Sequence, residues 1–293
     1  MNYRHGLWIL IGSTAALLTL TFGGRWIVGA WHAHRARDPT THIQAIIQTG
    51  PSREQLKTSY LAELMGLSLD HPQSLITFDL SKAEARLKQC PLIAEVAVEK
   101  LPPHTLYIDY TVRTPLARLG DYDNVALDRS GALFPLTPFL TPKDLPEFYL
   151  GLPSFLECAS WQRPLHDRGF TLALKLYDSL ASISWREGFR LKRIDVSNAW
   201  APSLGQREIV LFLDDDLLLN LPHHHLIAHF PKILRLPGKH WEAQLNSFLV
   251  LRRQMAQDYE RQLRAHPPKA REVSFAPRTI DLRIQKIAYV ENN

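Results

Sequence analysis

Residues 94–112 hold two alternating runs on either side of a proline pair, and this pattern constrains the fold more than any other in the chain. In Ala94–Glu99 and again in Leu106–Val112, apolar side chains occupy every second position. Pro102-Pro103 lies between the two runs and requires a turn there. Because a period of two belongs to a strand with one buried face, the pattern predicts an antiparallel hairpin with one wet face.

The segment before this hairpin predicts one strand followed by two helices. His42–Gln48 is expected to be the strand. A helix with its apolar face in residues 56–64 has a capping-box pattern at Ser52–Gln55 and a C-cap at Gly66. The same capping pattern at Ser81–Glu84 predicts a second, short helix. Two helices on one face of a small sheet would bury a single core and leave the other face wet.

An uncharged apolar run, Leu7–Phe22, predicts a membrane anchor extending to Trp31. A cleaved signal peptide is the alternative, but Ala30–Ala33 lacks the small-x-small spacing of a cleavage site. Before the run, only Arg4 and the amino terminus are positive, whereas Arg25, Arg35 and Arg37 follow it. Counted alone, these charges would place the folded part in the cytoplasm.

The second half of the chain predicts a mixed domain built on a mainly antiparallel sheet. Val125–Phe134 reads as a tight hairpin, with its turn at Asp128–Gly131. Helices are expected at Phe170–Ala181 and Trp241–Leu263. Further strands are expected at Leu191–Val196, Glu208–Leu213, Leu217–Leu221, Ile233–Leu236 and finally Arg278–Ile284, with a possible continuation to Val290.

Motifs that carry chemistry are scarce, so neither a metal, nor a cofactor, nor an enzymatic activity is expected. The histidine run His223–His225 and the later His229 lack a zinc-protease pattern and read as a polar loop. Asp214–Asp216 lies between two apolar strands and reads as a charged turn rather than a calcium loop. No nucleophile elbow or phosphate-binding loop is present in the sequence. Cys90 and Cys158 are consistent with two free thiols or with a disulfide.

The net charge of +5 is mild, and the basic residues are scattered. A nucleic-acid partner is therefore not expected, because such proteins gather their cations in a patch or stripe. A small-molecule substrate is not expected either, since no site for one is recognisable.

Several short motifs, in order along the chain, resemble the FtsQ/DivIB family of bacterial division proteins. They are CPLIAEVAVEKLPPHTLYIDYTVRTPLARL (Cys90–Leu119), VALDRSGALF (Val125–Phe134), LPEFYLGLP (Leu145–Pro153), ILRLPGKHWEAQL (Ile233–Leu245) and TIDLR (Thr279–Arg283). The sequence departs from the family in an apparent insertion at Pro222–Pro231 and in Arg113, where the family usually has an acidic residue. The strand-helix-helix-strand-strand segment resembles a POTRA domain.

The resemblance implies an α+β protein of five parts. These are a cytoplasmic tail (1–6), a transmembrane anchor (7–31), a linker (32–41), a POTRA-like domain (42–119) and an FtsQ/DivIB-type β domain (120–293). It also implies a single-pass protein of the bacterial cytoplasmic membrane, with its C-terminal domain outside. The implied function is a non-enzymatic divisome scaffold that binds FtsB/FtsL-like partners and controls septal wall synthesis. A POTRA-containing envelope assembly factor and a membrane-anchored envelope hydrolase are the alternatives.

The last strand is the expected partner-binding segment, since a terminal strand is often an edge strand that can accept another. The expected contact residues are Arg278, Thr279, Ile280, Asp281, Leu282, Arg283 and Ile284. The alternative is an inner strand whose isoleucines and leucine are core. Arg283 requires a carboxylate or solvent, and either a partner or a neighbouring residue such as Asp281 satisfies that need. A second partner surface is expected on the Val98–Val112 hairpin, at Val98, Lys100, Tyr107 and Asp109.

Overall fold

The structure is a computed structural model in which the chain divides into two compact units, Met1–Arg113 and Thr114–Asn293. It describes residues 25, 38–155, 160–161, 163–220, 225–230, 232–266, 268, 272–274, 277–285 and 287–292. The expected tail and anchor therefore lie outside the described residues apart from Arg25, as does Cys158. No helix in the described part of the chain is both long and apolar enough to cross a membrane.

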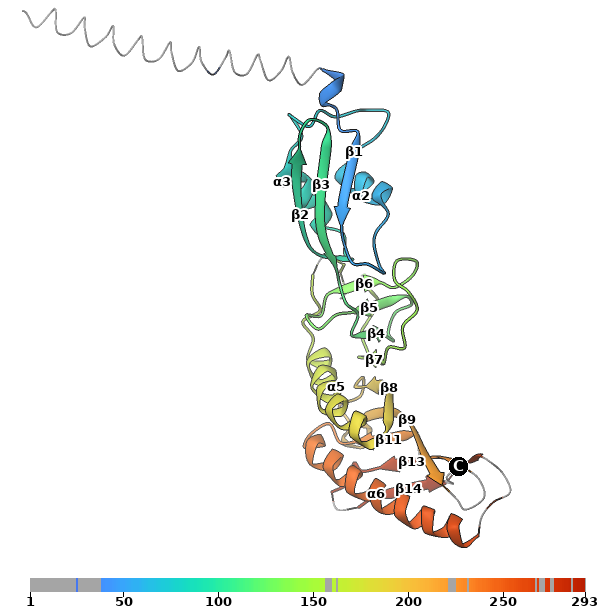
Figure 1. Cartoon of the computed structure of the whole chain (residues 1–293). Helices are drawn as coiled ribbons and strands as arrows, with labels where there is room; N and C mark the ends of the chain where they lie inside the picture. Colours follow the sequence, from blue (N-terminus) through green and yellow to red (C-terminus); the bar gives the residue numbers. More distant parts are fainter. Residues whose placement is uncertain are drawn as a thin grey trace, which may run out of the picture. The chain divides into compact units, whose positions relative to one another are not determined.

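The first unit is a three-stranded sheet with two helices (Figure 1). Its elements are the 3-10 turn η1 (Pro39–Thr41), β1 (Ala45–Thr49), α2 (Thr58–Met65), α3 (Leu80–Lys88), β2 (Ile93–Leu101) and β3 (Thr105–Val112). The strand order is β1-β3-β2, with β1 parallel and β2 antiparallel to β3. The hairpin predicted from the proline pair is confirmed, since β2 and β3 pair from Leu101↔Thr105 to Ile93↔Val112.

Both predicted capping boxes in this unit are wrong, although both helices exist. Helix α2 begins at Thr58, after Lys57, which makes no side-chain cap. Helix α3 is capped by Asp79, whose carboxylate accepts a hydrogen bond from the Lys82 N–H at 3.1 Å. The predicted C-cap is confirmed, because Gly66 has φ of 78°, the left-handed conformation that favours glycine.

The second unit is built on one large sheet and two long helices. Its strands are β4 (Ala117–Leu119), β5 (Val125–Leu127), β6 (Leu133–Pro135), β7 (Glu147–Tyr149), β8 (Phe189–Asp195), β9 (Ile209–Asn220), β10 (His225–His229), β11 (Ile233–Leu236), β12 (Glu272–Ser274), β13 (Pro277–Asp281) and β14 (Tyr289–Asn292). Its helices are α5 (Arg168–Glu187), the short η2 (Leu204–Gln206) and α6 (Trp241–Ala265). The main path is β14-β13-β11-β9-β8-β7-β4-β5-β6, and β10 and β12 extend from the far end of β9. Because β4 pairs with β5 and β7, it belongs to this unit rather than to the first.

The core of this sheet follows one continuous row of apolar side chains across seven strands. The strand pairings place in register Leu119, Phe148, Ile194, Leu211, Leu234, Ile280 and Val290. Helices α5 and α6 contribute Leu176, Leu180 and Phe248 to the same core. All of these residues are buried except Val290, which lies on the last strand and is 37% exposed.

The predicted turn at Asp214–Asp216 is wrong, because β9 runs through all three residues as one strand. Alternation along the strand places Asp215 inside, where it is only 2% exposed. There it accepts hydrogen bonds of 2.6 and 2.7 Å from Arg252 of α6. The Arg252 guanidinium also lies 5.5 Å from the ring centroid of Phe189 and 6.0 Å from that of Phe230. A buried carboxylate is tolerated here because a distant helix supplies its partner.

The histidine segment also differs from the prediction. His225–His229 forms strand β10 instead of a loop, and His229 Nδ1 lies 2.6 Å from the carboxylate of Asp216. Residues 221–224, which include the first two histidines, lie outside the described residues. Within the residues that are described, no cluster of three or more His, Cys, Asp or Glu side chains is arranged to hold a metal ion.

Candidate functional site

The strand expected to be a free edge is an inner strand, so that prediction is wrong. β13 pairs in parallel with β11 through Thr279↔Ile233 and Ile280↔Leu234. On its other side it pairs antiparallel with β14, through Ile280↔Val290. The alternative interpretation holds for two side chains, since Ile280 and Leu282 are core residues at 2% and 3% exposure.

Strand β14 takes the place of the predicted edge. In the described part of the sheet it pairs only with β13 and ends the strand order. Apolar side chains are concentrated around it. Ile284, Ile287 and Tyr289 are 64%, 58% and 65% exposed. Unpaired backbone groups beside exposed apolar side chains are the features that allow a second strand to be added.

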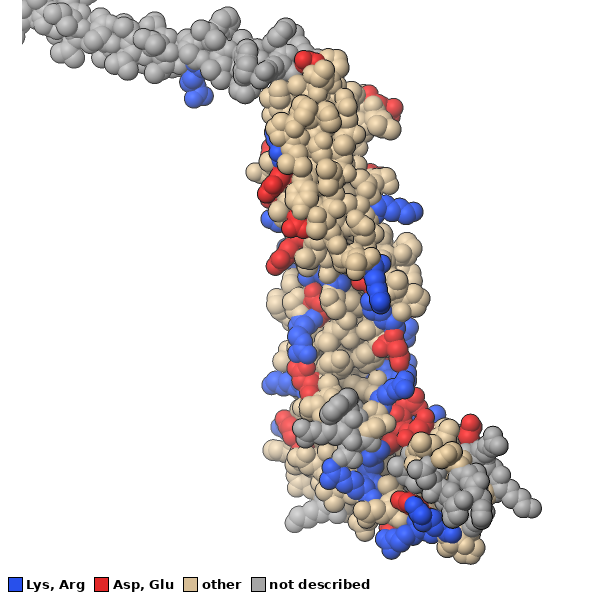
Figure 2. Space-filling view, in the orientation of Figure 1, with Lys and Arg blue, Asp and Glu red and all other residues tan. Residues whose placement is uncertain are grey.

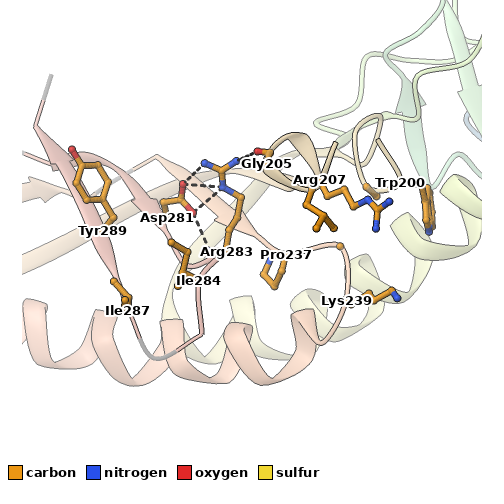
Figure 3. A pocket seen from close by; sticks show the side chains of 13 residues that line it. Trp200, Gly205, Arg207, Pro237, Lys239, Asp281, Arg283, Ile284, Ile287 and Tyr289 are labelled. Carbon is orange, nitrogen blue, oxygen red and sulfur yellow. Dashed lines mark hydrogen bonds and ion pairs between the residues drawn. The ribbon is translucent and has the colours of Figure 1, made fainter. Parts of the chain in front are cut away.

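A pocket of about 560 Å³ lies beside this edge (Figure 3). Three connections build it: the loop from β8 to β9, the turn from β11 to α6, and the turn from β13 to β14. The first loop contributes Trp200, Leu204 and Arg207, the second Lys239, and the third Ile287. Its walls are mainly apolar, and its charged residues are Arg207, Lys239 and the Asp281–Arg283 pair.

Arg283 connects the end of β13 to the β8–β9 loop that forms one wall of the pocket. Its guanidinium donates to both oxygens of Asp281, with Nη2–Oδ2 at 2.7 Å and Nε–Oδ1 at 3.1 Å. Its Nη1 donates to the Gly205 carbonyl at 3.0 Å and lies 3.2 Å from Glu208 Oε2. Figure 3 shows Arg283 joined to Asp281 and to Gly205. Of the two alternatives for this charge, the intramolecular pair is the one that forms.

The electrostatics of this pair favour its charged form. Burial raises the pKa of the Asp281 carboxyl, but hydrogen bonds from Arg283 outweigh burial and hold that pKa below its ordinary value. The hydrogen bond to Asp281 in turn raises the pKa of Arg283. Both groups therefore stay ionised at neutral pH and tie the end of β13 to the loop that carries Gly205.

The loop from β8 to β9 is ordered by its own contacts. Arg207 Nε donates to the Ala201 carbonyl at 2.6 Å, and its Nη2 donates to the Pro202 carbonyl at 3.4 Å. Arg168 of α5 lies 4.6 Å from the ring centroid of Trp200. These contacts leave Leu204 at the exposed tip of the loop, where 79% of it is accessible. The pocket is thus preformed rather than dependent on a mobile wall.

The predicted contact residues divide between three environments. Thr279, Ile280 and Leu282 lie within or beside the inner strand, Asp281 and Arg283 line the pocket, and Ile284 is exposed there. Arg278 lies in β13 at the register shift between Pro277 and Thr279, and its side chain is not described. The sequence interpretation missed Trp200, Leu204, Arg207 and Tyr289. Tyr289-Val290 carried a signal, an aromatic and a β-branched residue after a short break, which fits a separate strand.

The second predicted surface does not form one face. Val98 is buried at 4% exposure, and Lys100 donates to the Ile76 carbonyl on the helix side of the sheet. Tyr107 and Asp109 lie on the opposite, open face. Alternation along two paired strands separates these residues, so only the last two are available together.

The βααββ arrangement of the first unit defines the class of the domain. Residues 42–110 match the family described as "POTRA domain, FtsQ-type". The chain therefore carries a POTRA domain of the FtsQ type, which supports the resemblance to the FtsQ/DivIB family in this segment. Among curated proteins, none matches the chain.

This assignment indicates a scaffold role in cell division. POTRA domains of the FtsQ type mediate protein–protein interactions in division, and their family is generally non-enzymatic. The geometry of the second unit, a free strand edge beside a preformed apolar pocket, suits binding of another protein chain.

Proposed function

We propose that this chain is a non-enzymatic, membrane-anchored scaffold of the bacterial divisome, with residues 7–31 as its anchor and its folded part outside the cytoplasm. Its partners are FtsB/FtsL-like bitopic division proteins, and its role is to link early and late division components during septal wall synthesis. The observation that carries this proposal is the free edge of β14 beside the pocket, in a chain with an FtsQ-type POTRA domain.

The partner binds as an added strand. Backbone groups of β14 supply hydrogen bonds, and Val290, on the core side, offers an apolar contact. Residues flanking the added strand enter the pocket, where Ile284 and Ile287 present apolar surface. Arg207 and Lys239 favour an acidic group at its rim.

The decisive experiment places a charge on this edge. Val290→Lys should weaken the binding of an FtsB/FtsL-like partner to the full-length chain in detergent by about tenfold or more, since edge lysines block strand addition. Val250→Lys is the matched control, because Val250 is exposed on α6 and undergoes the same change. Equal affinities for the two variants, both folded by circular dichroism, would refute binding at β14.

Two further measurements test the rest of the proposal. An alkaline phosphatase fused to the C-terminus should be active, because that enzyme works only outside the cytoplasm. An inactive but intact fusion would contradict the placement. Release of wall fragments by the purified chain would favour the envelope hydrolase instead.

A further inference from the structure

The sheet of the POTRA domain has two edges, and the structure protects only one of them. At the β2 edge, the Glu84 carboxylate of α3 accepts a hydrogen bond from the Val98 N–H at 3.1 Å. Glu95 and Glu99 are exposed along the same strand, and the register shifts between Ile93 and Glu95. A capped N–H, charges and an irregular register each discourage pairing with another strand.

The β1 edge has none of these protections among the described residues. Ala45–Thr49 reads AIIQT and carries no charge, and Ile47 is 52% exposed. Gln44 N–H donates to the His104 carbonyl on the β3 side, so alternation directs the backbone groups of Ile47 and Thr49 away from β3. The start of the strand is covered, since His42 bridges to Ser74. The part of the β1 edge that is open to another strand therefore begins after this bridge and extends to Thr49.

The outward side chains of this sheet include acidic residues but no basic ones. The registers align its outward side chains in rows: Ala45, Thr105 and Leu101; Ile47, Tyr107 and Glu99; Thr49, Asp109 and Ala97; and Thr111 and Glu95. These positions hold three carboxylates and no lysine or arginine, in a chain whose net charge is +5. In Figure 2 most of the visible face of this unit is uncharged, and acidic side chains lie mainly along its left side, the side of β2 in Figure 1.

We infer that the β1 edge binds an extended, cationic segment of a partner protein, which adds to the sheet as a fourth strand beside β1. This surface lies in the first unit and is independent of the β14 site. The uncharged β1 strand supplies the backbone pairing, and the carboxylate of Asp109, on the strand next to β1, favours a cationic partner. A second copy of this chain is the competing occupant.

The geometry specifies how such a segment is recognised. A lysine or arginine facing the open side covers Ile47 with its methylene stem and directs its charge towards Asp109, which pairs with Thr49 across β1 and β3. Tyr107 holds this region in place, since its hydroxyl lies 2.9 Å from Thr49 Oγ1. The residues of the partner segment that alternate with these face Gln48 and α2. A segment that binds tightly therefore has uncharged side chains at those positions.

The test uses the full-length chain in detergent and two synthetic peptides, one alternating lysine with valine and one alternating glutamate with valine. The lysine peptide should bind and should protect backbone amides of residues 45–49 from hydrogen exchange. Ile47→Lys should weaken binding about tenfold, and Asp109→Asn should weaken it by a smaller factor that shrinks at high salt. Val250→Lys, the same kind of change on α6, should leave the affinity unchanged.

Several results would overturn the inference. They are equal binding of the two peptides, protection of β2 instead of β1, or equal effects of Ile47→Lys and Val250→Lys. Dimerisation of the chain that Ile47→Lys abolishes would assign the edge to a second copy. Circular dichroism melting of each variant establishes that a loss of binding is not a loss of folding.

Discussion

Two carboxylate–arginine pairs in the second unit have similar geometry and different surroundings. Asp215–Arg252 joins β9 to α6 with side chains 2% and 7% exposed. Asp281–Arg283 lies at the pocket, where the side chains are 15% and 28% exposed. Charges inside a core require a partner from a distant element, whereas a pair at the rim can be local, only two residues apart. The buried pair therefore specifies how the helix docks, and the rim pair specifies the shape of a binding site.

Removing the arginine of the buried pair should have the largest effect. Arg252→Met leaves Asp215 as an uncompensated charge, and we expect the free energy of unfolding to fall by about 3–5 kcal/mol. Urea denaturation measures this change. The double variant Asp215→Val/Arg252→Met should recover most of the loss, since an apolar pair removes the buried charge. A double variant as unstable as the single would show that packing of the Arg252 stem, not charge, explains the effect.

The same substitution at the rim should cost less. Arg283→Met breaks the hydrogen bonds to Asp281 and Gly205 and the ion pair with Glu208, but water can solvate the Asp281 carboxylate and the Gly205 carbonyl. We expect a loss of about 1.5–3 kcal/mol in the free energy of unfolding, the range for hydrogen bonds that involve charges. A loss as large as that of Arg252→Met would remove the distinction between the two pairs.

The stability that Asp281 contributes should depend on pH. Its pKa is lower in the folded chain than in the unfolded chain, so its contribution to stability is complete above the unfolded pKa of about 4. That contribution disappears as the pH falls through the folded pKa. The difference in unfolding free energy between the native chain and Asp281→Asn should therefore shrink between pH 7 and pH 3. A difference that stays constant over this range would contradict the role given to Arg283.

An exposed ion pair within α6 should contribute least to the free energy of unfolding. Arg264 and Glu260 are separated by four residues, with side chains 54% and 36% exposed. Arg264→Ala should change the free energy of unfolding by only about 0.3–0.5 kcal/mol, because solvent screens the pair. A larger change would mean that burial does not determine how much each of the three ion pairs contributes to stability.

Local patterns in the sequence were sufficient for elements whose pairing partners are near in the chain. The β2–β3 hairpin and the turn before Ala132 follow from alternation and from Asp128, whose carboxylate accepts from the N–H groups of Ser130 and Ala132. Helix starts were less accessible, because the capping boxes at Ser52 and Ser81 matched the pattern but not the structure. At α3, Asp79 supplies the cap instead, whereas α2 begins without a side-chain cap.

Non-local pairing explains the larger errors. Three consecutive aspartates favour a turn until Arg252, far away in the sequence, supplies a partner for the middle one. Likewise, whether β13 is an edge depends on Tyr289–Asn292 returning to pair with it, which no pattern within β13 reveals. The POTRA motifs located the domain, but the pocket is assembled from three separate connections.

The apolar row that crosses the second unit ends at Val290, the one member that remains partly open to water. A strand added to β14 would extend this row by one residue and bury its last side chain, so the core would be completed only in the complex. Binding and thermal stability would then be linked by mass action, and the melting temperature of the second unit would rise with partner concentration.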